Sequence, residues 1–126
     1  MLRTYDLIAF AATTDLERAR AFYEGVLGLE VREQSPYACV FDAAGTMLRV
    51  TAVGAVTQPG YTVLGWRVPD IVEAIDALAA RGVRFLRYDG MEQDEHGAWT
   101  TARGDRIAWF RDPDGNVLSL TQFAPD

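Results

Sequence analysis

The sequence carries one pattern twice. Residues 15–19 (DLERA) are echoed by residues 70–74 (DIVEA), and each segment follows a strand-like stretch and opens a helical pattern. Further along, residues 45–51 (GTMLRVT) are echoed by residues 115–121 (GNVLSLT). Two copies of a unit that cannot bury its own sheet face must pack together, and we expect a ligand site between the repeats. This duplication constrains the fold more than any other feature.

Each copy has the pattern β-α-β-β-β. The first helix begins at an N-cap, Thr14 or Asp15, and ends at Gly28, which suits the left-handed closing position. The second helix begins at Asp70 and ends at Gly82. Strands are expected near residues 5–11, 29–34, 37–42, 46–53, 61–67, 83–87, 106–111 and 116–122. The chain is then a single domain with a first module over about 1–53, a linker at 54–60 and a second module over about 61–126.

Composition excludes several classes of protein. The 12 basic and 18 acidic residues give a net charge of −6, which argues against nucleic acid and anionic membranes as partners. No apolar run is long enough to span a membrane, and the first residues do not read as a signal peptide. The lone cysteine, Cys39, excludes an internal disulfide framework. We therefore expect a cytoplasmic protein.

Three segments carry a family resemblance. The patterns at 15–29, 82–85 (GVRF) and 110–116 (FRDPDGN) resemble the vicinal oxygen chelate superfamily. That superfamily contains glyoxalases, extradiol dioxygenases, fosfomycin-modifying enzymes and bleomycin-resistance binding proteins. The resemblance implies an α+β fold in which two β-α-β-β-β modules form a cup-shaped half-barrel sheet with helices outside. It also implies a homodimer.

Enzymes of this superfamily hold a divalent metal with one residue from the first and fourth strands of each module. The resemblance places these positions at Ile8, Arg49, Val63 and Ser119. Metal-dependent members carry His, Glu or Gln there, whereas this set offers only one serine oxygen beside a cation and two alkyl groups. The chain also has a single histidine, His96, too few for a non-haem iron site. We expect no metal and no other cofactor, and no catalytic residues.

Strand alternation and the resemblance together predict a ligand pocket. Its expected residues are Ile8, Phe10, Arg49, Val63, Gly65, Ser119, Trp109 and Trp99. Gly65 would leave space on the inward face, and the two tryptophans would form either a flat wall for a planar ligand or part of the core. Arg49 would pair with Asp6, or would meet an anionic or carbonyl group of the ligand.

Other reactive side chains have structural interpretations. His96 lies in an acidic segment that is typical of a solvated loop, and Cys39 fits a buried thiol. Asp112 and Asp114 fit a turn, and Trp66 is expected on the helix side of its strand.

The leading hypothesis is therefore a metal-free small-molecule binding protein that resembles the bleomycin-resistance type and sequesters or carries an aromatic, partly polar compound. The alternative is a lyase, isomerase or dioxygenase-like enzyme of the same superfamily that acts on a small metabolite. A module that binds nothing is the third possibility.

Overall fold

The computed structural model describes all residues from 1 to 126. The chain divides into two compact units. The first holds residues Met1–Gln58 together with Pro113–Gly115, and the second holds Pro59–Asp112 together with Asn116–Asp126. Each unit is described by itself, and the expected single domain stays a prediction.

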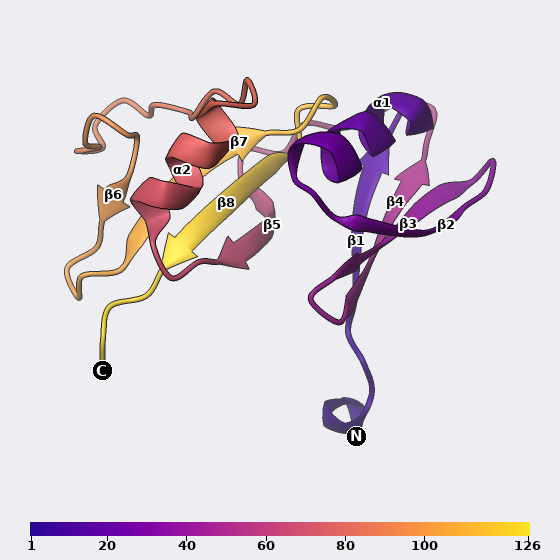
Figure 1. Cartoon of the computed structure of the whole chain (residues 1–126), viewed down its shortest axis with the longest axis horizontal. Coiled ribbons are helices and arrows are strands. Elements are labelled where there is room, and N and C mark those ends of the chain that lie inside the picture. The colour runs from indigo at the N-terminus through magenta and orange to yellow at the C-terminus, as the bar shows by residue number, and fades with distance from the viewer. The chain divides into compact units, whose positions relative to one another are not determined.

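The two units repeat the same order of elements (Figure 1). The first contains η1 (Leu2–Thr4), β1 (Ile8–Thr13), α1 (Leu16–Arg20), η2 (Ala21–Val26), β2 (Glu30–Gln34), β3 (Ala38–Ala43) and β4 (Thr46–Ala52). The second contains β5 (Thr62–Arg67), α2 (Ile71–Ala79), β6 (Trp99–Thr100), β7 (Arg106–Arg111) and β8 (Val117–Gln122). The α+β class and the two tandem modules are confirmed. None of the helices is both long and apolar enough to cross a membrane.

The first helix begins and ends as its sequence predicts. Asp15 is the N-cap, and its carboxylate accepts the N–H of Arg18 at 3.1 Å. The helix then widens into the π-type stretch η2, where the N–H of Leu27 reaches back to the carbonyl of Phe22 at 2.9 Å. Gly28 ends it with a φ of 77°, which a side chain would oppose.

The sheet of the first unit has the order β1-β4-β3-β2, with β1 parallel to β4 and the other pairs antiparallel. One face packs against α1 and buries Phe41, Leu48 and Val50, and Phe41 contacts the ring of Tyr23. The opposite face has no helix on it. We call it the first open face, defined by Ile8, Phe10, Met47 and Arg49.

The sheet of the second unit has the equivalent order β5-β8-β7-β6. Helix α2, capped by Asp70, contacts β7 and β8 and buries Ile71 and Ile75. The register places Trp66 level with Leu120 on this side of the sheet, as expected. The opposite side is the second open face, defined by Gly65, Trp99, Trp109 and Ser119.

The predicted strand at 83–87 is wrong. Only an isolated bridge joins Phe85 to Phe110 there, and the rest of that edge of β7 is paired by the unpredicted strand β6, in which Trp99 lies opposite Ile107. The side chain of Gln93 competes for the backbone groups that a longer strand would use. It donates to the carbonyl of Leu86 and accepts the N–H of Tyr88, so the pairing with β7 does not continue past Phe85. The other predicted strands and both helices are found within a few residues of the expected bounds.

Candidate functional site

The first open face carries apolar side chains around one guanidinium, with Asp42 opposite Met47 on the next strand. Phe10 on β1 lies opposite Arg49 on β4, and Ile8 lies opposite Met47. Phe10 and Ile8 keep 57% and 44% of their surfaces exposed, an unusual amount for such side chains on a sheet. A hollow of about 320 Å³ lies beside Ile8 and Met47, and its walls also include the charged residues Asp6, Arg32 and Asp42. Phe10 and Arg49 do not line it. This volume is within the range of small-molecule sites.

Arg49 has no partner in the protein. Its side chain is half-buried, and it forms neither a hydrogen bond nor an ion pair with any other residue. The pair with Asp6 is therefore not formed. Its strand neighbours on this face are Phe10 and the buried Val40, neither of which can accept a hydrogen bond through its side chain. A guanidinium without an acceptor must keep contact with water or meet an acceptor from outside the chain.

The second open face is built around one rung of three strands. Gly65 on β5, Ser119 on β8 and Trp109 on β7 lie side by side. Ser119 is buried, and its hydroxyl has no hydrogen-bond partner in the chain. Because no fully buried side-chain polar atom lacks a partner, the Ser119 Oγ keeps some contact with solvent. A Cβ at residue 65 would lie 2.7 Å from the Ser119 Oγ. The glycine therefore keeps the approach to this hydroxyl open.

An aromatic cluster borders that rung. The rings of Trp99 and Trp109 are 6.4 Å apart and tilted by 33°, and Tyr88 meets the Trp109 ring edge-on at 5.5 Å. All three side chains are half-buried. The two tryptophans therefore pack against each other and keep part of their surfaces accessible. Tyr88 was missed by sequence reasoning, because nothing local shows that its loop returns to Trp109.

The inserted loop between residues 86 and 98 is fixed from within. The Gln93 amide group donates to the carbonyls of Leu86 and Gly97 at 2.8 Å each and accepts the N–H of Tyr88 at 2.7 Å. Asp94 accepts the N–H groups of His96 and Ala98 and pairs with Arg106. Burial would raise the pKa of Asp94, but these bonds and the Arg106 charge lower it below its ordinary value. The loop therefore holds Tyr88 on a defined backbone.

The predicted site residues fall into two groups, with one exception. Ile8, Phe10 and Arg49 share the first open face, and Gly65, Ser119, Trp109 and Trp99 share the second. Val63 is the exception. The pairing of β5 with β8 shifts between Thr62 and Leu64, so Val63 is an extra residue in a bulge, where simple alternation does not fix its side. Its side chain is half-buried.

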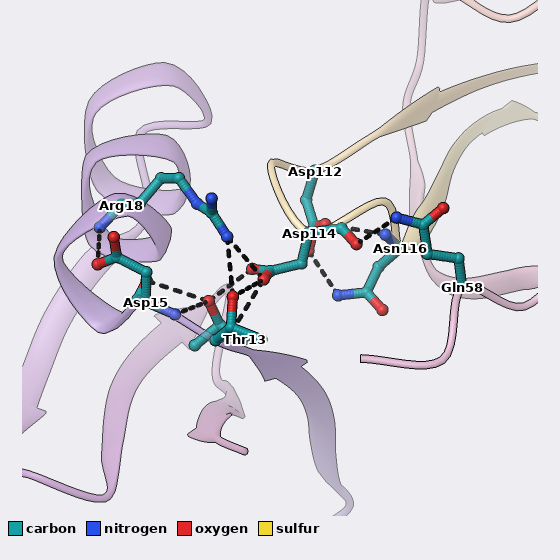
Figure 2. Close-up of polar contacts among 8 residues, drawn as sticks. Thr13, Asp15, Arg18, Gln58, Asp112, Asp114 and Asn116 are labelled. Atoms are coloured by element: carbon teal, nitrogen blue, oxygen red, sulfur yellow. Dashed lines mark hydrogen bonds and ion pairs between the residues drawn. The ribbon is translucent and has the colours of Figure 1, made fainter. Parts of the chain in front are cut away.

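Asp114 does more than form a turn (Figure 2). Its carboxylate accepts the hydroxyl of Thr13 at 2.5 Å, the N–H and hydroxyl of Thr14 at 2.9 and 3.0 Å, and Nη2 of Arg18 at 2.8 Å. Burial alone would raise the pKa of Asp114, but the threonine bonds and the Arg18 charge lower it below its ordinary value. Both oxygens of this carboxylate accept bonds inside the first unit, so it anchors the start of α1.

The remaining reactive side chains are also accounted for. Asp112 accepts the backbone and side-chain N–H groups of Asn116 at 2.9 and 2.8 Å, which closes the turn between β7 and β8. Cys39 is fully buried, and that burial raises its pKa, which makes it a poor nucleophile. His96 lies 3.4 Å from Asp76 and 3.6 Å from Glu95. Nowhere do three His, Cys, Asp or Glu side chains gather as metal ligands would.

The residues at the four metal positions of the superfamily do not fit a metal ion. Ile8 and Val63 have no lone pair, Arg49 carries a positive charge, and the neutral hydroxyl of Ser119 is the only oxygen in the set. Divalent ions in proteins need several anionic or imidazole ligands at once. These four side chains, at the positions that the resemblance assigns, therefore do not supply the ligand set of a divalent metal.

Comparison with known proteins adds a family and a fold. The family model of the Glyoxalase/Bleomycin resistance protein/Dioxygenase superfamily matches residues 6–120. No curated protein sequence matches the chain.

Solved structures with the same fold include a glyoxalase/bleomycin resistance protein/dioxygenase from Alicyclobacillus acidocaldarius, with 19% identity, a TM-score of 0.73, and 97% of this chain and 93% of that chain covered. A lactoylglutathione lyase from Agrobacterium tumefaciens has 21% identity and a TM-score of 0.71, with 94% of both chains covered. The fosfomycin resistance protein FosX from Listeria monocytogenes has 16% identity and a TM-score of 0.74, with 94% and 92% covered.

At these identities the structures indicate a shared fold and leave the activity open. The family match, in contrast, covers nearly the whole sequence and includes both repeats. The chain belongs to the Glyoxalase/Bleomycin resistance protein/Dioxygenase superfamily.

Proposed function

We propose that this protein binds a small aromatic, partly polar compound without a metal ion, and sequesters or carries it. The observation that carries the proposal is Arg49, a half-buried guanidinium with no partner, set among apolar side chains on the first open face. A ligand with an anionic or carbonyl group would supply the missing acceptor, and its apolar part would cover Phe10 and Ile8.

The second open face supports the same chemistry independently. The Trp99 and Trp109 rings offer a flat surface for a planar group, and the Ser119 hydroxyl offers one donor and two acceptor sites. A few polar groups on an apolar background are typical of small-molecule sites. A binding role also agrees with the unfit metal positions, because binding needs no Lewis acid.

A pair of probes tests the role of Arg49. The anionic dye 1-anilinonaphthalene-8-sulfonate and its uncharged analogue N-phenyl-1-naphthylamine differ in one sulfonate. We expect the native protein to bind the anionic dye saturably. Arg49→Met should weaken that binding by about 10- to 100-fold, the scale of a hydrogen bond to a charged group, and should leave the uncharged dye almost unaffected. Arg84→Met, which removes an exposed arginine of the second unit, is the control.

Equal losses for both dyes, or no loss for either, would contradict the proposal. Titration of the intrinsic tryptophan fluorescence with a panel of planar natural products then searches for the ligand itself. Product analysis of the same mixtures by mass spectrometry addresses the enzymatic alternative, for which we expect no turnover.

We further propose that the protein is a cytoplasmic homodimer. Strands β1 and β5 lie at the edges of their sheets, and β1 carries no charged residue that would discourage pairing. An interface between two copies would protect such edges. The free, buried Cys39 suits a reducing compartment.

A further inference from the structure

A second hollow lies at the far end of β5, in the second unit. Its volume is about 660 Å³, and it is bounded by the chain that leaves β5, by the chain that leaves β8, and by the turn before β7. Arg67, Pro69, Arg103, Phe123 and Pro125 are among its walls. None of these residues belongs to the open faces discussed above.

The walls of this hollow are held by three backbone anchors. The N–H of Val68 continues the β5–β8 pairing by donating to the carbonyl of Thr121 at 2.9 Å. The N–H of Ile71 donates to the side chain of Gln122 at 2.8 Å, and the N–H of Ala124 donates to Asp105 at 2.8 Å. The hollow is thus bordered by backbone that is tied down on both sides of β8.

The hollow holds one unpaired cation, Arg67. The Arg67 guanidinium lies 5.0 Å from the centre of the Phe123 ring, and no carboxylate lies within ion-pair distance of it and no acceptor binds its N–H groups. Arg103 pairs with Asp105 at 3.3 Å but is 72% exposed, so this pair is weak. Asp126 lines the hollow without pairing with either arginine. Two arginines and the carboxylates of Asp105 and Asp126 lie at this hollow, so an anion is attracted by the unpaired guanidinium of Arg67 and not by an excess of positive charge.

We propose that this hollow binds small carboxylic acids with an apolar body. The carboxylate would engage the fork of N–H donors on Arg67, with Arg103 adding charge, and the apolar body would lie on Pro69, Phe123 and Pro125. A phosphate group fits less well. It needs donors on several sides, and the nearby amides of Val68, Ile71 and Ala124 already donate elsewhere.

The test uses benzoate as the probe, with benzamide as its uncharged analogue and inorganic phosphate as the competing anion. Backbone amide chemical shifts of the intact protein are followed by ¹⁵N NMR during each titration. Benzoate should shift residues 67–69 and 122–125 saturably, and benzamide and phosphate should not. Arg67→Met should weaken benzoate binding by about tenfold or more, and Arg67→Lys, which keeps the charge and loses the fork, by a smaller factor.

Arg84→Met is the matched control, because it removes an exposed guanidinium that lines neither hollow. It should leave the benzoate shifts at this hollow unchanged. Equal shifts with benzoate and benzamide, a response to phosphate alone, or benzoate shifts that persist in a well-dispersed spectrum of Arg67→Met would each overturn the proposal. A failure here leaves the proposed function of the first open face standing, because the two tests read different residues.

Discussion

Replacing Asp114 with asparagine tests the anchor at the start of α1. The Asp114 side chain is only 3% exposed and accepts four bonds, so the change keeps the shape and removes the charge. The amide would turn an N–H₂ group toward the Thr13 hydroxyl or toward the Arg18 guanidinium, where a carboxylate oxygen now accepts. The anchor should therefore weaken without losing its geometry.

The size of the effect follows from the bonds that are lost or weakened. A bond to a charged group contributes about 1.5–3 kcal/mol and a neutral one about 0.5–1.5 kcal/mol, so each buried threonine bond should lose about 1 kcal/mol. Arg18 is 45% exposed, and its ion pair adds little. The free energy of unfolding should fall by about 2–3 kcal/mol, and Tm by roughly 6–15 °C for a chain of this length.

Urea unfolding at a series of pH values is the assay. Because the pKa of Asp114 is lowered in the folded protein, its stabilising effect is present above the carboxyl pKa of the unfolded chain and is lost as the pH falls through the folded value. The gap between the native protein and Asp114→Asn should therefore close in acid. Asp89→Asn, at an exposed position, should differ from the native protein by less than about 0.5 kcal/mol. The proposed anchor is refuted if Asp114→Asn lowers the free energy of unfolding at pH 7 no more than Asp89→Asn does. It is also refuted if the difference between the native protein and Asp114→Asn does not change with pH.

Four further results are expected. Arg49→Met should leave the free energy of unfolding almost unchanged, since no pair with Asp6 is broken; urea unfolding that shows a loss of about 3 kcal/mol would instead reveal a buried partner. Gly65→Ala should destabilise the protein, because the added Cβ meets the Ser119 Oγ at 2.7 Å, and Ser119→Ala should relieve that effect in the double variant. Gly60→Ala, where a Cβ meets open space, is the control. Additive effects of Gly65→Ala and Ser119→Ala on the free energy of unfolding would refute the contact. Elemental analysis should find no stoichiometric divalent metal after dialysis, and a chelator should not shift Tm; about one tightly held zinc, nickel, manganese or iron per chain would refute the metal-free proposal. Light scattering at micromolar concentration should give the mass of a dimer, and a monomer mass would contradict the proposed assembly.

The fold could be predicted because its signals are local and repeated. The cap at Asp15, the closing glycine at 28 and the equivalent pair in the second repeat each need only a few neighbouring residues to act. The same is true of strand alternation, which correctly placed Phe10 and Arg49 on one face. Repetition then confirmed each assignment a second time within one chain.

Each failure depends on how residues far apart in the sequence pair in space. The strand expected at 83–87 was displaced by the Gln93 amide, which takes backbone groups that a longer pairing would use. The position of Val63 depends on a bulge, and a bulge is visible only in the pairing register. The absent Arg49–Asp6 pair was an inference from a shared face, and sharing a face does not bring two side chains within bonding distance.

The inclusion of residues 113–115 in the first unit has a consequence for synthesis on the ribosome. Residues 1–58 emerge first, but the carboxylate that anchors the start of α1 is translated more than fifty residues later. At ordinary rates of about 5–20 residues per second, the nascent first unit waits roughly 3–11 s without Asp114. During that interval the N–H of Thr14 can bond only to water, and the hydroxyl of Thr13 can bond to water or to the carbonyl of Asp15. Co-translational folding of the first unit should therefore finish only after the second repeat has almost been completed, so the order in which the chain is made is not the order in which its units are finished.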